Sequence, residues 1–421
     1  MSLKIITLDN GLRIALERND NARTCSLGAW VASGSAYETA QTAGVSHFIE
    51  HMLFRGTESR TSLDIAEQMD EIGGVINAYT AKELTCFYAA TLPEHMTKAL
   101  DIICDMITHP LFAPEDIELE KGVIKEEIAM YEDSPEDLCA DIYYENVWRG
   151  SMLGSNILGT VETVDSVTAD TLRAHMKRFY VPERTVFSFS GNFDPDAAVE
   201  ICKNYFGGME NTGFAIENVG AEYRPCITRV KKGFMQNQLI LGFKGIPTGD
   251  GKRYVSMLLS SILGAASSSR LFQRLREELG LVYSVDCANV SHMAAGLFII
   301  CMGLAEKSEE KAIGETLRII REFPDSVTER ELARAKEQTV VGFVMGLESA
   351  SAVASRNGRN ILLFGSVAPE EEIIRRIRAV TLDELRDFAR ETLDTSAVSL
   401  CAAGKVHSEN QYKKFLNVQG V

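Results

Sequence analysis

The sequence predicts an α+β fold of two homologous domains, each an antiparallel sheet packed against helices. Two pairs of segments indicate a duplication. Segments beginning at Val167 and Val380 share a helix start, a helix, a break, a strand and a glycine, and lie 213 residues apart. Gly28 and Gly242 each lie in the middle of an apolar strand pattern, 214 residues apart. Because these separations are nearly equal, we expect the chain to contain one structural unit twice.

A polar segment without periodicity, from Gly208 to Pro225, separates the two repeats and is typical of a connection between domains. The length of 421 residues is also too great for one ordinary domain. We therefore predict a first domain at residues 1–210, a linker at 211–228 and a second domain at 229–421.

The strands of the first half are indicated by short apolar and β-branched runs bounded by turn residues. Asp9, Asn10 and Gly11 form a hairpin signal between the first two runs. A later pair of runs flanks Lys82 and Glu83, which predicts an antiparallel pair. The expected strands are residues 4–8, 13–17, 25–33, 75–80 and 85–92.

The helices of the first half are indicated by residues that favour helix starts and stops. Thr61 or Ser62 is a candidate N-cap, and Gly73 is a candidate left-handed stop. Pro114 and Pro135 stand near the starts of two later helices. The expected helices are residues 45–54, 63–72, 94–108, 115–131 and 135–147. The second half repeats this order, with helices expected at 254–263 and 271–279 before a strand pair and further helices.

The composition excludes several classes of protein. Apolar residues make up 45% and charged residues 24%, which is typical of an ordinary globular protein. The net charge of −16 argues against nucleic acid as a partner, because phosphate binding requires a basic surface. The same charge is compatible with basic peptide ligands, although an acidic surface also serves solubility alone.

The cysteines and the apolar runs indicate a cytoplasmic protein. The nine cysteines are scattered and contain no C-x-x-C pair, so we expect buried thiols in a reducing compartment. The N-terminal residues lack the apolar core of a signal peptide. The longest weakly polar run, from Met293 to Ala305, is too short to span a bilayer, and we expect no membrane partner.

A metal-binding pattern lies in the first predicted helix, where the sequence reads His47-Phe48-Ile49-Glu50-His51. Residues i and i+4 of a helix share a face, so both imidazoles can bind one ion beside the Glu50 carboxylate. Zinc accepts such nitrogen ligands, and a catalytic zinc site keeps a position open for water. The pattern therefore predicts one catalytic Zn²⁺ per chain, with Glu50 as the general base.

Acidic residues of the predicted helix 115–131 are the candidates for a third ligand. Glu120 and Glu127 lie two turns apart on a largely apolar face, where an unpaired carboxylate is costly to bury. Glu126 lies on a second face that is also apolar. Periodicity alone therefore leaves the choice between Glu126 and Glu127 open.

The spacing between these residues resembles the inverted zinc motif of the insulinase/pitrilysin metallopeptidases, the inverzincins. Glu127 follows His51 by 76 residues, as the distal glutamate of that family does, and Glu120 matches the family's glutamate that supports a zinc ligand. The resemblance covers essentially the whole chain and is closest to short bacterial members and the catalytic subunit of the mitochondrial processing peptidase. Further matching segments are LDNGLRI, AGVSHFIEHMLFRGT, GGVINAYT, YEDSPED and SSSRLFQRLREELGLVYSV.

The resemblance also assigns substrate-binding roles. Arg276 and Tyr283 match an Arg/Tyr pair that, in the family, reaches the substrate backbone near the zinc. Asn77 and Ala78 match the edge strand along which the family's peptide substrates add as an extra strand. The second repeat has no H-x-x-E-H, which implies one metal site per chain. The segment LGAASSSRLF lacks the glycine run of the non-catalytic processing-peptidase subunit, so the chain resembles the catalytic type.

The resemblance implies a zinc endopeptidase that hydrolyses peptides or unfolded polypeptide segments. Because the zinc motif and the Arg/Tyr pair occur in one chain, we expect a homodimer. Two alternatives remain open: the catalytic subunit of a heterodimeric processing peptidase, and a non-catalytic structural relative.

Overall fold

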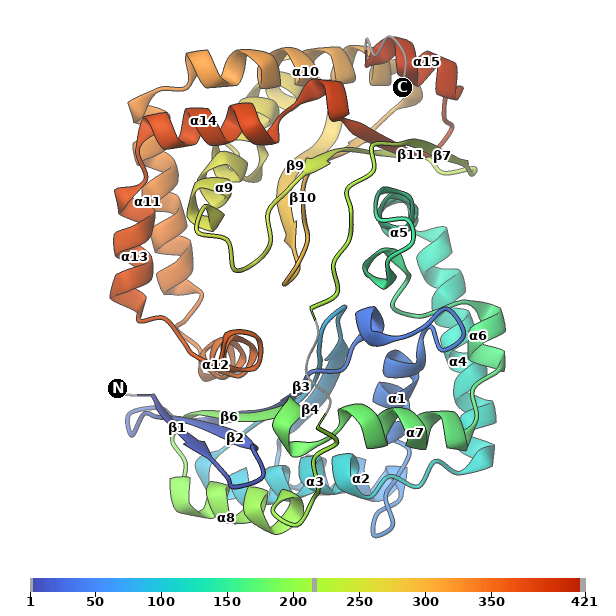
Figure 1. The fold of residues 1–421 in the computed structure, drawn as a ribbon, viewed down its shortest axis with the longest axis vertical. Helices are drawn as coiled ribbons and strands as arrows, with labels where there is room; N and C mark the ends of the chain where they lie inside the picture. Colours follow the sequence, from blue (N-terminus) through green and yellow to red (C-terminus); the bar gives the residue numbers. More distant parts are fainter. Residues whose placement is uncertain (1–2, 214–217, 417–421) are drawn as a thin grey trace. The chain divides into compact units, whose positions relative to one another are not determined.

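The computed structural model describes residues 3–213 and 218–416, which form two compact units. Unit 1 comprises the described residues of Met1–Ile128, Ser155–Glu217 and Met345–Val367. Unit 2 comprises those of Ala129–Gly154, Asn218–Val344 and Ala368–Val421. Each unit is one sheet packed against helices, so the predicted α+β class is confirmed (Figure 1).

The sheet of unit 1 has six strands in the order β1-β2-β6-β3-β5-β4. The buried strands β3 and β6 form its centre, while β4 is an edge strand with alternating exposed and half-buried residues. The strands are β1 (Lys4–Thr7), β2 (Arg13–Arg18), β3 (Cys25–Val31), β4 (Val75–Thr80), β5 (Thr85–Thr91) and β6 (Thr185–Gly191).

The sheet of unit 2 has five strands in the order β7-β11-β8-β10-β9 and repeats the arrangement of unit 1 without a counterpart of β1. The strands β7, β11, β8, β10 and β9 correspond in order to β2, β6, β3, β5 and β4. The strands are β7 (Ile227–Lys231), β8 (Asn237–Lys244), β9 (Val282–Ser291), β10 (Gly296–Leu304) and β11 (Ser399–Gly404).

Each sheet contains one parallel pair in addition to its antiparallel pairs. In unit 1, β2 pairs with β6 in parallel, and in unit 2, β11 pairs with β7 in parallel. Two parallel neighbours must be joined by a long crossover connection. In each repeat, this connection contains most of the other strands and helices of the repeat. The shared position of this pair in both sheets supports the duplication expected from the sequence.

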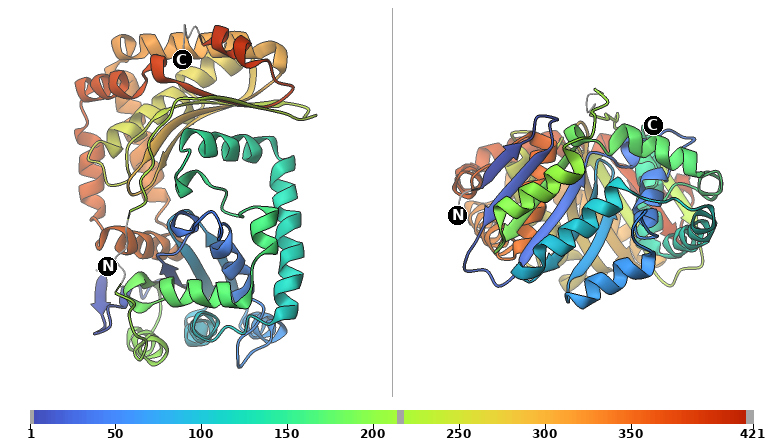
Figure 2. Two further views of the ribbon diagram at one scale, coloured as in Figure 1. Left: turned by 45° about the vertical axis from the view of Figure 1, so that its right-hand side comes forward. Right: turned by 90° about the horizontal axis from the view of Figure 1, so that it is seen from below.

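The helices cover the sheets and carry most of the connections (Figure 2). They are α1 (Val45–Leu53), α2 (Ser62–Glu71), α3 (Met96–Thr108), α4 (Pro114–Asp133), α5 (Pro135–Val147), α6 (Val161–Asp165), α7 (Ala169–Phe179), α8 (Pro195–Phe206), α9 (Arg253–Ser260), α10 (Glu309–Ser326), α11 (Glu329–Met345), α12 (Ala350–Phe364), α13 (Glu370–Ala379), α14 (Leu382–Thr392) and α15 (Glu409–Phe415). The helices predicted at 254–263 and 271–279 contain π-helical segments, at Ser261–Ala265 and Phe272–Glu278.

Two helices pack on the sheet of the other repeat. Helix α12 follows most of the second repeat but packs on β3 and β6 of unit 1, and α5 lies in the first repeat but packs on β8 and β11 of unit 2 (Figure 1). The units are therefore discontinuous in sequence. The predicted linker at residues 211–228 divides the two sequence repeats, which differ from these two units, and it stays a prediction.

Glycines permit both of these helix–sheet contacts. In unit 1, Gly358 of α12 lies against the Trp30 ring of β3, where a methyl group would overlap the indole. In unit 2, Gly242 of β8 lies against the ring of Tyr143 from α5, with the same consequence. Gly242 is one of the two glycines that mark the repeat, and the close approach of its backbone to an aromatic ring explains why glycine occupies this position.

No helix within the described residues is both long enough and apolar enough to cross a membrane.

Candidate metal centre

Helix α1 is buried on most of its surface and carries three polar side chains of the predicted site. Its apolar residues, including Phe48 and Ile49, are fully buried and fix the helix in the core of unit 1. The rings of His47 and His51 lie side by side with centroids 4.6 Å apart, as expected for residues one helical turn apart. His47 has an exposed fraction of 7%.

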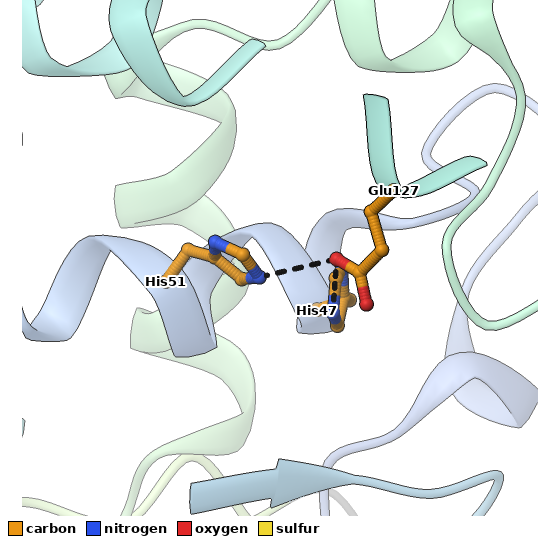
Figure 3. Close-up of side chains that lie close together, drawn as sticks. All are labelled: His47, His51 and Glu127. Carbon is orange, nitrogen blue, oxygen red and sulfur yellow. Dashed lines mark ion pairs between the residues drawn. The ribbon is translucent and has the colours of Figure 1, made fainter. Parts of the chain in front are cut away.

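Helix α4 brings Glu127 to these two histidines (Figure 3). Glu127 Oε2 lies 3.6 Å from His47 Nε2 and 3.5 Å from His51 Nε2. Within the described part of the chain, these three side chains are the one group of at least three His, Cys, Asp or Glu residues that could hold a metal ion. The neighbouring Glu126 is exposed and is not part of the group.

The donor set fits a zinc ion. Two imidazole nitrogens and one carboxylate oxygen are a common protein contribution to catalytic zinc. With metal–ligand bonds of about 2.0–2.1 Å, tetrahedral geometry places neighbouring ligand atoms about 3.4 Å apart. The separations of 3.5 and 3.6 Å that Glu127 Oε2 makes with the two histidines are close to this value.

Glu120 orients His51 from the other side of the imidazole. Its Oε2 lies 2.8 Å from His51 Nδ1, which leaves His51 Nε2 facing Glu127. Glu120 is buried, and its second oxygen accepts hydrogen bonds from the Arg55 guanidinium. A carboxylate bonded to the outer nitrogen of a histidine fixes the ring and is typical of metal-binding histidines.

The two histidines lie in different electrostatic environments. Burial, together with the neighbouring His51, lowers the pKa of His47 to about 4. Burial also opposes protonation of His51, but the carboxylates of Glu120 and Glu127 outweigh it and raise the pKa of His51 to about 9. The pKa of Glu127 is lowered, chiefly by its hydrogen bond with His51.

Glu50 lies beside this group and contacts the sheet. Its Oε2 accepts a hydrogen bond of 2.6 Å from Thr80 Oγ1 of β4. Burial raises the pKa of the Glu50 carboxyl, and the Thr80 hydroxyl partly offsets this effect. Glu50 and His51 also line a cavity of about 370 Å³, which Asn77 and Glu120 border. This cavity gives a ligand access to the Glu50 carboxylate.

The predicted substrate-binding residues of the first repeat lie on β4. This strand is the edge of the sheet in unit 1, so one of its sides is unpaired within the sheet. Asn77 is exposed and borders the cavity, while the N–H of Ala78 donates to the side-chain oxygen of Asn77 at 2.8 Å.

The predicted Arg276 and Tyr283 lie in unit 2. The Arg276 guanidinium carbon is 6.0 Å from the centroid of the Tyr283 ring and 4.8 Å from that of Phe272. Tyr283 has an exposed fraction of 70%, high for an aromatic side chain. The two residues are therefore brought together within unit 2, and their role toward substrate stays a prediction.

Sequence reasoning missed Thr80 and Arg55. Thr80 contacts Glu50, and Arg55 contacts Glu120. In each pair the two residues come from different segments of the chain, so no spacing within one helix reveals the contact. The one local signal was a cation, Arg55, four residues after His51.

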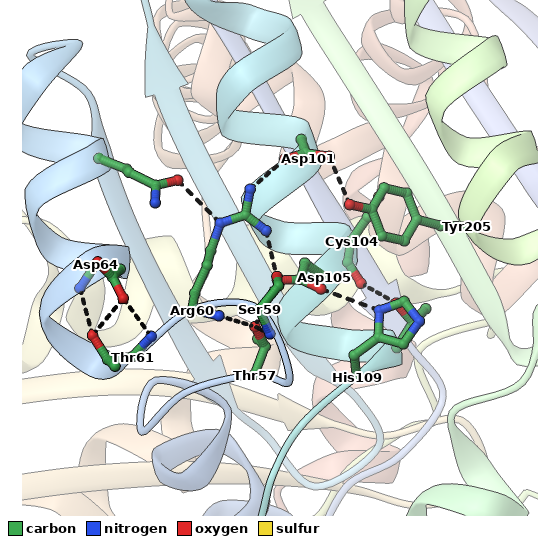
Figure 4. A network of polar contacts seen from close by, with 12 residues as sticks. Thr57, Ser59, Arg60, Thr61, Asp64, Asp101, Cys104, Asp105, His109 and Tyr205 are labelled. Atoms are coloured by element: carbon green, nitrogen blue, oxygen red, sulfur yellow. Dashed lines mark hydrogen bonds and ion pairs between the residues drawn. The ribbon is translucent and has the colours of Figure 1, made fainter.

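A polar network anchors the segment between α1 and α2 (Figure 4). Arg60 pairs with Asp101 and Asp105 of α3 at 2.5 Å each. Thr57 Oγ1 and Ser59 Oγ donate to Asp105 at 2.7 and 2.8 Å. Arg55, whose guanidinium binds Glu120, lies at the start of this anchored segment.

Comparison with known proteins gives the family. The family model described as insulinase (peptidase family M16) matches residues 13–161, and that of the M16 inactive domain matches residues 166–339. A Bacillus subtilis protein named uncharacterized zinc protease YmxG is 38% identical over 411 residues, covering 96% of this chain and 100% of that protein.

Solved structures share the fold. The crystal structure of a protease from Helicobacter pylori has a TM-score of 0.88 at 18% identity and covers 96% of this chain and 99% of its own. A chain in the structure of complex III2 from Candida albicans has a TM-score of 0.85 at 20% identity, with coverages of 99% and 100%. The sequence matches, which span nearly the whole chain, show that this protein belongs to the insulinase (M16) peptidase family.

Proposed function

We propose that this chain is a zinc-dependent endopeptidase that hydrolyses peptides or unfolded polypeptide segments. The observation that carries the proposal is the convergence of His47, His51 and Glu127 beside the Glu50 carboxylate. The relatives named as zinc proteases support the same activity.

His47, His51 and Glu127 would hold one Zn²⁺ per chain. When bound, zinc lowers the pKa of a coordinated water to about 7 and polarises a peptide carbonyl. Glu120 keeps the His51 ring in the orientation that presents Nε2 to the site. The buried surroundings of α1 hold the histidine backbones rigid, which keeps the ligand atoms close to their required separation.

Glu50 acts as the general base in this proposal. Burial raises the pKa of its carboxyl, which makes the carboxylate a better proton acceptor. The Thr80 hydroxyl holds one carboxylate oxygen, so the carboxylate has a fixed direction. Glu50 takes a proton from the attacking water and can then deliver it to the leaving amine.

The peptide is proposed to add to the free edge of β4, past Asn77 and Ala78. Main-chain hydrogen bonds along an edge strand bind an extended peptide with little dependence on its sequence. Folded proteins would be poor substrates because their backbones are already paired. Arg276 and Tyr283 are proposed to bind substrate, as the family resemblance implies, and the active form is proposed to be a homodimer.

The experiment that tests this proposal compares the wild type with Glu50→Gln. We expect the wild type to hold one zinc per chain and to cleave unstructured peptides, and Glu50→Gln to keep its zinc but lose more than a hundredfold in kcat/KM. Glu118→Gln, an exposed position on α4, is the matched control and should retain activity. A fully active Glu50→Gln would rule out the assigned base.

Two alternative functions stay as candidates. The chain could be the catalytic subunit of a heterodimeric processing peptidase, or it could have a non-catalytic structural role. The likeness to a chain of complex III2 shows that this fold also occurs in a multi-subunit assembly. A wild type that binds zinc but cleaves no peptide when purified alone would favour these alternatives over a homodimeric enzyme.

A further inference from the structure

A buried carboxylate from outside the zinc motif holds the start of α1. Glu38 has an exposed fraction of 6%, and its two oxygens accept hydrogen bonds from two backbone groups. Oε2 accepts from the N–H of Gly44 and Oε1 from the N–H of Ser46, both at 2.7 Å. The first N–H groups of a helix have no partner within the helix, and a negative charge there also complements the helix dipole.

The same turn of α1 is held by a second contact. The hydroxyl of Ser46, which is fully buried, lies 3.4 Å from Nε2 of His175 on α7. The same nitrogen lies 2.9 Å from Ser33 Oγ. Burial lowers the pKa of His175 to about 3, so its ring is neutral near pH 7. Ser46 is thus fixed through its backbone by Glu38 and through its side chain by His175.

The residue after Ser46 is His47, and the two histidines of the zinc motif are supported in different ways. His51 Nδ1 is bound by the Glu120 carboxylate. His47 Nδ1 is buried and has no hydrogen-bond partner among the described residues. No described side chain therefore orients the His47 ring as Glu120 orients that of His51, and the placement of the His47 ring depends on the backbone of the first turn of α1.

The second repeat provides an internal comparison. Helix α9 follows β8 as α1 follows β3, and α9 carries no metal-binding histidines. Its N-cap residue, Lys252, makes no side-chain capping bond, and the N–H of Lys252 donates to Oδ1 of the half-buried Asp250 two residues earlier. In the described structure, the buried two-oxygen clamp thus occurs in the repeat that has the zinc motif and not at the equivalent helix of the other repeat.

We propose that Glu38 is a positioning residue that sets the location of His47 by clamping the N–H groups of Gly44 and Ser46. This inference rests on the proposed metal site and extends it. Glu38 performs for His47, through the backbone, what Glu120 performs for His51 through the imidazole. Loss of the clamp lets the first turn of α1 shift, and the His47 nitrogen then departs from the separation that a tetrahedral ion requires.

The test measures the metal rather than peptide cleavage. Glu38→Gln keeps the size of the side chain but replaces one acceptor oxygen with an NH₂ group, which cannot accept an N–H. We expect the Kd for Zn²⁺, measured by competition with a chromophoric chelator, to rise about 10- to 100-fold, as for other residues that support a metal ligand. In the Co²⁺-substituted protein, the d–d absorption of Glu38→Gln should differ from that of the wild type.

The control is a buried carboxylate of the same kind far from α1 in the chain. Glu309 in unit 2 is fully buried and accepts hydrogen bonds from Asn237 and Tyr412. Glu309→Gln should lower stability while leaving the zinc Kd and the cobalt spectrum unchanged. If Glu38→Gln does not fold, Glu38→Asp keeps the charge but shortens the side chain, so that the carboxylate no longer reaches both N–H groups, and it should raise the zinc Kd severalfold.

A folded Glu38→Gln, or in its place Glu38→Asp, with the zinc Kd of the wild type would overturn the inference while leaving the metal site intact. A wild type that binds no zinc would instead overturn the proposed function. The two failures are therefore distinguishable in one titration.

Discussion

Glu120 Oε2 lies 2.8 Å from His51 Nδ1, and seven residues later on the same helix Glu127 faces the other nitrogen of that ring. The His51 imidazole is therefore held between two carboxylates of α4. The Glu120 carboxylate fixes the ring, and the Glu127 carboxylate belongs to the group that can bind an ion.

This relationship predicts that Glu120→Gln binds zinc about 10- to 100-fold more weakly than the wild type, because the ring of His51 loses its charged acceptor. Chelator competition measures the change. Glu118→Gln, two residues away on the same helix, should show the wild-type affinity, and equal affinities for the two variants would contradict the role of Glu120.

The choice between Glu126 and Glu127 gives a second prediction. Glu127→Gln should lose stoichiometric zinc at micromolar metal, since a neutral amide is a poor zinc ligand. Glu126→Gln should keep the metal, because Glu126 is exposed and lies outside the candidate group. Metal analysis after gel filtration distinguishes them, and the reverse result would show that the metal is held differently.

Thr80 gives a third prediction, concerned with catalysis and not with metal binding. Thr80→Val removes the hydroxyl that donates to Glu50 Oε2 but preserves the shape of the side chain. A hydrogen bond to a charged group contributes about 1.5–3 kcal/mol, so we expect kcat/KM to fall about tenfold or more while bound zinc is retained. Loss of zinc would point to a structural role for Thr80 instead.

The pH dependence of stability gives a fourth prediction, located in unit 2. Burial disfavours the Glu331 carboxylate, but Arg270 and Thr328 outweigh this effect and hold the pKa of Glu331 at about 2. Because folding lowers this pKa, the stabilisation is complete above pH 4.5 and is lost as the pH falls toward 2. Urea unfolding should show that Glu331→Gln lowers stability by about 2 kcal/mol at pH 7 and by much less at pH 3. A constant difference between these pH values would contradict the assignment.

Gly358 gives a fifth prediction, about packing. Gly358→Ala places a methyl group against the Trp30 ring and should destabilise unit 1 by about 1–3 kcal/mol. Gly342→Ala in α11 is the matched control, because the added methyl group meets no atom within 4 Å. It should be neutral or stabilising, since alanine favours a helix over glycine by about 1 kcal/mol. Thermal unfolding of both variants measures the contrast.

The sequence predicted those features that depend on local spacing. The i, i+4 separation of His47 and His51 places both rings on one face of any helix. The nearly equal offsets of the repeats predicted one structural unit present twice, and the two sheets have matching strand orders. The α+β class and the membership of the insulinase family are confirmed. These properties require only the periodicity of a helix and the similarity of two segments.

Features that depend on tertiary contacts could not be predicted in this way. Periodicity did not separate Glu126 from Glu127, because both lie on apolar faces, and the family resemblance made that choice. Glu38 and Thr80 reach α1 from other segments, and nothing in their neighbouring residues marks them. The parallel pairs within the sheets were also unforeseen, since strand direction is set by the path of the helices between strands.

The exchange of α12 and α5 between the repeats has a consequence for how the protein is made. Trp30 and Val186 of unit 1 are covered by α12, whose residues lie near the end of the chain. During synthesis on a ribosome, the first repeat emerges with this apolar face uncovered, and the face stays uncovered until most of the second repeat has been translated. A gene divided at the linker would therefore yield two fragments that each lack a covering helix. Neither fragment is then expected to be soluble by itself, and until α12 is made we expect the uncovered apolar face of the nascent chain to be open to chaperones.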